Sequence, residues 1–327
     1  MTAQQKSPDL LSLDGVTCLD NGQVALAGPA WRLFQRLDCL FASWAREFGA
    51  DEHSFPPFLP AHELAKLDYF RSFPHLITIP VTLADSDDNL RSFVDGEPLD
   101  ADASLNLPAL SPVKEVLTPA ACYHVYVAMQ GRALDSPAFV TTRAACFRRE
   151  REYVPLQRQW SFSMREIVCI GAADEVKEFL KAARARVDSF LSEIHLPIAW
   201  QNATDPFFNP AKNPRYLMQK LEPVKTEMVF ADRLAIGSVN FHRNYFGEAF
   251  RIIRKGEDAY SGCIAFGLER WMYAFVHHFG TNEADWPLSA PAIDRIATGS
   301  VAARRVAAAD NANARASAQE DDGDDRS

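Results

Sequence analysis

Residues 138–149, AFVTTRAACFRR, and residues 159–171, QWSFSMREIVCIG, decide the architecture of this chain. Both stretches are rich in β-branched and aromatic residues, which pack well on a pleated sheet. A charged segment, residues 150–158, separates them. The pattern predicts an antiparallel hairpin of two long strands joined by a long, charge-rich loop.

The second of these strands carries a carboxylate on an apolar face. Side chains alternate between the two faces of a strand, so Cys146, Arg148 and Glu150 share a face of the first strand, and Phe162, Met164, Glu166, Val168 and Ile170 share a face of the second. A buried carboxylate is costly unless it is paired or bound to a metal. By pattern alone, Glu166 therefore indicates a partly open face, an ion pair with an arginine, or a functional site.

The rest of the chain supplies helices and further strands in irregular order. Apolar residues at helical spacing predict helices over residues 31–48 and 175–194. We also expect helices over 62–70 and 269–279, the latter entered through Gly267, and strands over 74–83 (with Pro80 at an edge), 226–230, 235–241 and 263–266. Residues 85–112 are acidic and rich in turn formers, which predicts a long surface excursion. This order favours an α+β fold around an antiparallel sheet flanked by helices.

Composition narrows the class of protein. The chain has 327 residues, of which 47% are hydrophobic and 24% charged, as in globular proteins with a full core. The net charge of −9 disfavours a protein whose main task is binding nucleic acid. The sequence contains no apolar run of about 18 residues, the length that predicts a membrane span. Residues 1–9 are polar and lack the apolar core of a signal peptide, so we expect a cytoplasmic protein.

The two ends differ from the middle. Residues 297–327 contain no Leu, Ile, Phe, Trp or Tyr and finish in a run of Asp and Glu. Such a segment cannot bury enough apolar surface to offset its ordering entropy. We therefore expect a mobile N-terminus over residues 1–12, one catalytic domain over 13–296 and a disordered Ala-rich, acidic tail over 297–327.

Two short motifs resemble those of a known protein family. Phe147-Arg148-Arg149-Glu150 precedes a long loop, and Gly267-Leu268-Glu269-Arg270 opens a helix far downstream. In this order they resemble motifs 2 and 3 of class II aminoacyl-tRNA synthetases. Residues 119–122, PAAC, and the pair Phe162 and Glu166 stand where the seryl enzymes have a Pro-Thr-Ala-Glu segment, an adenine-stacking Phe and a substrate-contacting Glu. The resemblance covers roughly residues 60–285 and implies a class II synthetase-like catalytic domain.

One departure from the seryl pattern points to a narrower family. Cys122 replaces the Glu of that segment, Glu166 is kept, and Cys263 comes just before the third motif. This set resembles the zinc site of the archaeal-type seryl-tRNA synthetases and of their truncated relatives, the amino acid:[carrier protein] ligases. Two thiolates and a carboxylate leave a tetrahedral Zn²⁺ one open position, as in substrate-binding rather than structural sites. The resemblance thus implies metal ligands at Cys122, Glu166 and Cys263.

The resemblance also implies roles for the nucleotide-binding residues. Arg148 would contact the α-phosphate and the substrate carboxylate, and Arg270 the γ-phosphate. Phe162 and Arg270 would sandwich the adenine ring, and Glu150 would contact its edge. The seryl family carries a Mg²⁺-binding acid on a late strand, but residues 234–238, LAIGS, contain none, so Glu227 is the substitute that we predict. Asn240 is expected to face the same site.

The resemblance implies a ligase that uses ATP, Mg²⁺ and Zn²⁺ to activate glycine or alanine as the adenylate. The amino acid would then pass to the phosphopantetheine thiol of a small carrier protein, and the enzyme would be a homodimer without a tRNA or membrane partner. Residues 1–60 offer one helix and a proline cluster rather than the heptads of a tRNA-binding coiled coil. A tRNA-charging seryl enzyme and a non-catalytic synthetase-like regulator stay open as alternatives.

Overall fold

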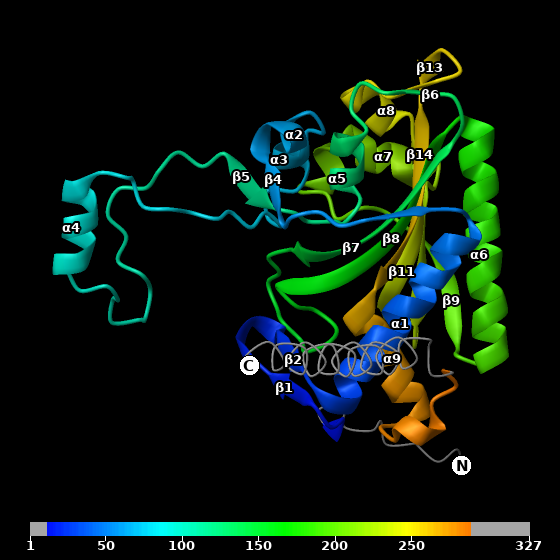
Figure 1. Ribbon diagram of the computed structural model, residues 1–327, viewed down its shortest axis with the longest axis horizontal. Coiled ribbons are helices and arrows are strands. Elements are labelled where there is room, and N and C mark those ends of the chain that lie inside the picture. Colours follow the sequence, from blue (N-terminus) through cyan, green and yellow to red (C-terminus); the bar gives the residue numbers. More distant parts are fainter. Residues whose placement is uncertain (1–11, 289–327) are drawn as a thin grey trace, which may run out of the picture. The chain divides into compact units, whose positions relative to one another are not determined.

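The computed structural model describes residues 12–288 (Figure 1). The chain divides into two compact units, Met1–Asp285 and Trp286–Ser327, and only residues 286–288 of the second are described. The predicted tail over 297–327 lies outside the described residues, as does the predicted N-terminal segment except for Ser12. Within the described part, no helix has the length and apolar character that crossing a membrane requires.

A seven-stranded sheet forms the centre of the first unit. In spatial order its strands are β3 (Asp51–His53), β7 (Ala138–Phe147), β8 (Ser161–Gly171), β14 (Tyr260–Gly267), β11 (Leu234–Arg243), β10 (Lys225–Phe230) and β9 (Ile198–Ala203). Neighbours are antiparallel throughout, except that β3 runs parallel to β7. The predicted hairpin is confirmed as β7 and β8, and the α+β class with it.

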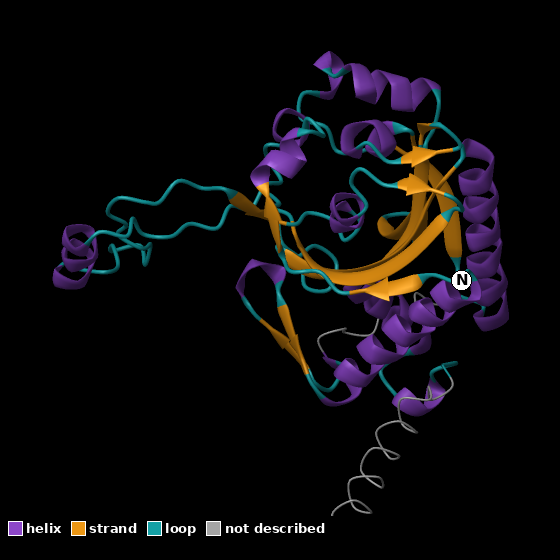
Figure 2. Cartoon of the chain, turned by 45° about the horizontal axis from the view of Figure 1, so that its top comes forward, coloured by secondary structure: helices purple, strands orange, loops and turns teal. Residues whose placement is uncertain are grey.

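Three long helices cover one face of this sheet (Figure 2): α1 (Gly28–Glu47), α6 (Ala173–Ile194) and α9 (Leu268–Phe279). Their buried sides follow the apolar stripes that the sequence shows. The ring of Phe41 on α1 stacks on Phe266 of β14 with centroids 4.1 Å apart. Gly262 lets α6 approach closely, because a Cβ there would lie 2.9 Å from Leu180 and 3.0 Å from Val176. The three helices therefore pack closely on this face of the sheet.

Short helices pack on the opposite face: α2 (Ala61–Ala65), α3 (Tyr69–Ser72), α5 (Tyr123–Ala128), α7 (Pro214–Leu221) and α8 (Tyr245–Phe250). The rings of Tyr126 on α5 and Phe246 on α8 stack with centroids 3.9 Å apart. The remaining elements are β1 (Val16–Cys18), η2 (Asp20–Gly22), β2 (Val24–Leu26), β4 (Phe58–Pro60), α4 (Asp87–Asp95), β5 (Glu115–Leu117), β6 (Ala133–Leu134), η3 (Pro210–Lys212), β12 (Ile253–Arg254), β13 (Glu257–Asp258) and η4 (Glu283–Asp285).

The predicted surface excursion over residues 85–112 is confirmed. It forms an arm that carries α4 away from the sheet in both views (Figures 1 and 2). Asn89 of α4 joins the two chain segments at the outer end of the arm, since its side chain bonds to the carbonyls of Ala84 (2.9 Å) and Ala109 (3.0 Å) and to the Ala109 amide (3.0 Å), while the Leu117 amide donates to the Thr78 carbonyl (3.0 Å) nearer to β5. The arm is therefore an insertion whose two ends lie side by side.

Two local predictions are wrong. Residues 74–83 do not form a strand: only an isolated bridge at Leu83 has ladder geometry, since Pro80 lacks the N–H that a ladder needs. The helix predicted over 62–70 is broken into α2 and α3 at Asp68, whose φ of 50° is left-handed. The sequence pattern also missed β9 and the short helices α4, α5, α7 and α8, which are too short to show a period.

Candidate active site

A cavity of about 510 Å³ lies on the face of the sheet that carries the short helices. Strands β8, β14 and β11 form its floor, with Met164, Ala265 and Ser238 among the lining side chains. The loop after β7 lines one end of the cavity, and residues between 205 and 222 line another side. The predicted residues Arg148, Glu150, Phe162, Glu227, Asn240 and Arg270 all line this cavity, together with Cys122, Glu166 and Cys263.

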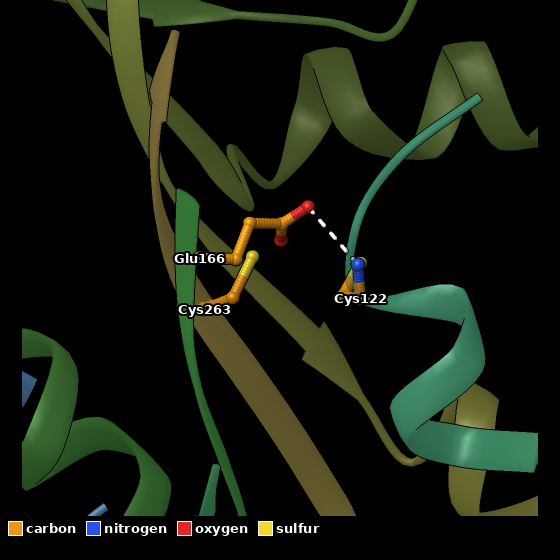
Figure 3. A group of neighbouring side chains, drawn as sticks. All are labelled: Cys122, Glu166 and Cys263. Atoms are coloured by element: carbon orange, nitrogen blue, oxygen red, sulfur yellow. Dashed lines mark hydrogen bonds between the residues drawn. The ribbon is translucent and has the colours of Figure 1, made fainter. Parts of the chain in front are cut away.

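The three predicted metal ligands meet at the floor of the cavity. The Sγ atoms of Cys122 and Cys263 and a carboxylate oxygen of Glu166 lie within 4.8 Å of one another. Glu166 on β8 and Cys263 on the neighbouring strand β14 both point toward Cys122, the residue that precedes α5 (Figure 3). All three side chains are buried. The fold therefore brings together residues that are 44 and 97 positions apart in the sequence.

The environment of Glu166 decides between the three interpretations of its place on an apolar face. The residue is only 2% exposed, so the face is not open. Its Oε1 accepts hydrogen bonds from the amides of Ala121 (3.0 Å) and Cys122 (3.1 Å), one of which is drawn in Figure 3. The adjacent Arg165 pairs instead with Asp38. Backbone amides thus hold this carboxylate beside two thiols.

The two thiols perturb each other. The hydrogen bond with Cys263, burial and the Glu166 carboxylate raise the pKa of Cys122 well above its ordinary value. For Cys263 the hydrogen bond with Cys122 lowers the pKa, but burial and Glu166 outweigh it and the net shift is upward. The Asn240 amide also donates to Cys263 Sγ at 3.3 Å. We call Cys122, Glu166 and Cys263 the metal-binding set, because two thiols and a carboxylate this close are donors that a metal cation can bind.

Arg148 and Phe162 lie together at the other end of the cavity. The Arg148 guanidinium is 5.2 Å from the centroid of the Phe162 ring, and its Nε donates to the carbonyl of Pro119 at 2.8 Å. The cation over Phe162 is therefore Arg148, whereas the sequence prediction pairs that ring with Arg270 across adenine. Glu150 follows in the loop and lines the same end.

Arg270 stands in the first turn of α9 and ties two segments together. Its Nε donates to the carbonyl of Gln157 (2.7 Å) and its Nη1 to that of Ala235 (2.9 Å). Burial and the Arg148 charge lower the pKa of Arg270. Beside it, Glu269 accepts from the Ser163 amide at 2.9 Å, and burial raises the Glu269 pKa to about 7. A guanidinium desolvated in this way favours an anionic ligand.

Glu227 and Asn240, the remaining predicted residues, occupy neighbouring strands. Glu227 on β10 lies 3.2 Å from Lys225 Nζ, an ion pair that occupies the predicted Mg²⁺ ligand. Asn240 on β11 stands opposite Cys263 in the strand register and donates to Ser238 as well as to that sulfur. Asn240 is thus beside the metal-binding set, while Glu227 is beside a lysine.

Sequence reasoning missed several groups that line the cavity. Asp205 pairs with Lys225 at 3.2 Å and bonds to Gln219 on α7, which fastens the 205–222 segment to β10. Asn213 and Pro214, an N-cap residue followed by Pro at the first helical position, are a signal that could have found α7. His242 Nε2 lies 3.7 Å from Cys263 Sγ, and burial lowers the His242 pKa to about 4, so this ring is neutral near pH 7.

Comparison with known proteins identifies close relatives. No family model matches the chain. The amino acid–[acyl-carrier-protein] ligase 1 of Bradyrhizobium diazoefficiens is 34% identical over 263 residues, which span 78% of this chain and 79% of the relative. The type-2 serine–tRNA ligase of Methanococcus maripaludis is 25% identical over 286 residues, 81% of this chain but only 55% of that protein.

A solved structure supports the fold. The crystal structure of M. kandleri SerRS in complex with A. aeolicus tRNASec matches with a TM-score of 0.69 at 20% identity, covering 83% of this chain and 56% of that one. The prediction of a class II synthetase-like antiparallel sheet flanked by helices is confirmed by this likeness.

Proposed function

Since the chain belongs to the amino acid–[acyl-carrier-protein] ligase family, we propose that it activates a small amino acid with ATP and transfers it to a carrier protein. We propose glycine or alanine as the amino acid and the phosphopantetheine thiol of the carrier as the acceptor. The observation that carries the proposal is one cavity with a Cys, Glu, Cys set at its floor and an arginine beside an aromatic ring at its other end.

The donor set fits a zinc ion. Zn²⁺ binds thiolate and carboxylate ligands in tetrahedral geometry, and three protein ligands leave one position for a substrate. Cys122, Glu166 and Cys263 would hold it, since their ligand atoms already lie within 4.8 Å of one another. When bound, the ion supplies a site for the neutral α-amino group of the substrate.

The residues at the nucleotide end suit the chemistry of adenylation. The amino acid carboxylate attacks the α-phosphorus of ATP, and pyrophosphate leaves. Arg148 would neutralise the carboxylate and the α-phosphate, Arg270 would hold the γ-phosphate, and Phe162 would stack on adenine. We propose Glu150 at the adenine edge and Glu227 as the residue that would hold the Mg²⁺ that accompanies ATP, with Asn240 facing the same site.

Transfer completes the reaction. The carrier thiol, as its thiolate, attacks the carbonyl carbon of the mixed anhydride, a thioester forms and AMP leaves with the bonding pair. A flexible phosphopantetheine arm can enter a cavity that a folded carrier could not. We further propose that the enzyme is a homodimer. We also propose that it acts without tRNA, because a net charge of −9 disfavours a nucleic-acid partner.

Amino-acid-dependent ATP–pyrophosphate exchange tests the proposal. We expect exchange with glycine or alanine, and thioester formation on a phosphopantetheinylated carrier but not on the unmodified carrier or on tRNA. If exchange occurs but neither the carrier nor tRNA receives the amino acid, only the activation step of the proposal stands. Charging of tRNA would indicate the seryl-type alternative. The absence of exchange would indicate a non-catalytic regulator.

Elemental analysis tests the metal separately. We expect one zinc per chain in protein purified without added metal, and its loss in Cys263→Ser. The matched control is Cys169→Ser, because Cys169 is equally buried but lies outside the ligand set. Wild-type protein that lacks zinc yet exchanges at full rate would refute this assignment.

A further inference from the structure

A buried ion cluster lies on the helix-covered face of the sheet, directly behind the metal-binding set. Its centre is Arg165 of β8, which follows the strand alternation and points away from the side to which its neighbour Glu166 points. Arg165 donates to Asp38 of α1 through Nε (2.5 Å) and through Nη2 (3.2 Å). The two side chains are only 4% and 10% exposed. The cluster is thus well shielded from water.

Two further charged residues complete the cluster from its rim. Arg165 Nη2 donates to Glu52 of β3 at 2.9 Å, and Arg143 of β7 donates to Asp38 at 3.0 Å. Their side chains are 57% and 44% exposed, so water solvates both of them. The rim residues contribute little to holding Arg165, since exposed ion pairs are weak.

A single hydroxyl connects this cluster to the backbone of the metal ligand. Arg165 Nη1 donates to Thr141 Oγ1 at 3.3 Å, and the same hydroxyl donates to the carbonyl oxygen of Glu166 at 2.9 Å. Thr141 is 1% exposed, so no water replaces either bond. The hydroxyl proton is directed to Glu166 because the guanidinium can only donate.

The position of Glu166 in turn sets the position of a second ligand. The Glu166 carboxylate accepts from the amides of Ala121 and Cys122, which are the residues that lead into α5. A displacement of the Glu166 backbone would therefore move its own carboxylate and the Cys122 thiol together. The contacts run without a gap from α1 through the sheet to the metal-binding set.

Stability alone does not explain the buried pair of Arg165 and Asp38. Well-packed apolar side chains in place of a buried ion pair often leave a protein equally stable or more stable. The two-pronged contact between guanidinium and carboxylate instead fixes direction as well as distance. Directional contact next to a metal ligand is what a positioning role requires.

We propose that Asp38, Arg165 and Thr141 are positioning residues that hold the backbone of Glu166 so that its carboxylate meets both thiols. This inference rests on the proposed metal site and deepens it. The residues act through Glu166 and touch neither the substrate nor the metal.

The test measures zinc affinity in the full-length, folded protein by competition with a chromophoric chelator. Thr141→Val removes only the hydroxyl and keeps the shape, so we expect zinc binding to weaken about 10- to 100-fold, with Thr141→Ser close to wild type. Asp38→Asn is expected to weaken zinc similarly. Glu52→Gln and Arg143→Gln are the matched controls from the exposed rim, and we expect them to stay within about twofold of wild type.

Cobalt replacement provides a second readout. The visible absorption of Co²⁺ bound to the two thiolates should shift or weaken in Thr141→Val and match wild type in the rim controls. Unchanged zinc affinity and an unchanged cobalt spectrum in Thr141→Val would overturn the inference, even if Asp38→Asn fails to fold. Failure of the metal site itself has a different signature, because wild type would then bind no zinc or Glu166→Gln would bind it as tightly as wild type.

Discussion

The buried carboxyl of Glu269 makes stability depend on pH in a way that one substitution can expose. This side chain lies in the first turn of α9, 7% exposed, with the Ser163 amide 2.9 Å from each of its carboxylate oxygens. Burial, only partly offset by that hydrogen bond, raises its pKa from 4.5 to about 7. The folded protein therefore binds a proton here more tightly than the unfolded chain does.

The coupling between protonation of Glu269 and folding sets how the free energy of unfolding changes with pH. A carboxyl whose pKa is raised on folding stabilises the fold fully at low pH, and that stability is lost as the pH rises from about 4.5 to about 7. At about 1.4 kcal/mol per pKa unit, ionised Glu269 costs about 3 kcal/mol above pH 7. Gln imitates the protonated form and keeps a carbonyl oxygen for the Ser163 amide. Glu269→Gln should thus stabilise the protein by about 3 kcal/mol at pH 8 and by less than about 1 kcal/mol at pH 5.

Denaturant unfolding at the two pH values measures this difference. Wild type and variant are compared with the same metal load, so that titration of the thiols cancels. Glu248→Gln serves as the control for a Glu-to-Gln change, because Glu248 is exposed on α8 and its replacement should change the free energy of unfolding little. An effect of Glu269→Gln that is equal at pH 5 and pH 8 would refute the argument that burial raises this pKa.

Four other predictions follow from single features. Arg270→Ala should lower pyrophosphate exchange at least about 100-fold while circular dichroism shows a folded protein. If most of the variant is instead unfolded and the part that remains folded exchanges at nearly the wild-type rate, Arg270 has a structural role. Phe162→Ala should raise the KM for ATP about tenfold, because a stacked base is worth about 1–3 kcal/mol, with zinc content unchanged. Gly247→Ala should lower the free energy of unfolding by about 1–3 kcal/mol in urea titrations, since its Cβ would lie 2.1 Å from the Ala259 carbonyl oxygen. Removing residues 297–327 should leave exchange and transfer rates equal to those of the full chain; a large loss of exchange would show that the tail contributes to the active site.

The long elements could be predicted because each shows a period. The stripe on residues 175–194 gave α6, and alternation gave β7, β8 and the shared face of Phe162 and Glu166. Residues 74–83 show the limit of this reasoning, since β-branched residues there suggested a strand where Pro80 leaves no ladder. Helices of four to eight residues, such as α5 and α7, are set by tertiary contacts and leave no periodic trace.

The proximity of Cys122, Glu166 and Cys263 was predictable only through resemblance. Nothing in spacings of 44 and 97 residues indicates that Cys122, Glu166 and Cys263 meet. The one local signal was the carboxylate of Glu166 on an apolar face, which the structure shows buried and bound to two amides. The role of Asp38 left no signal, because its partner Arg165 is distant in the sequence and the pair is buried only after the sheet forms.

Strand β8 carries one residue of the proposed adenine site and one of the metal-binding set. Phe162 and Glu166 share a face and are four residues apart, which corresponds to about 13 Å along a strand. One strand thus sets the separation between the ring proposed to stack on adenine and the carboxylate of the metal-binding set. A slip of one residue would turn both side chains to the helix-covered face and bring Arg165 to the cavity. The register with β7 and the pairing of Arg165 with Asp38 both oppose that slip. The contacts that stabilise this hairpin are therefore the same contacts that hold the two ends of the cavity at a fixed distance.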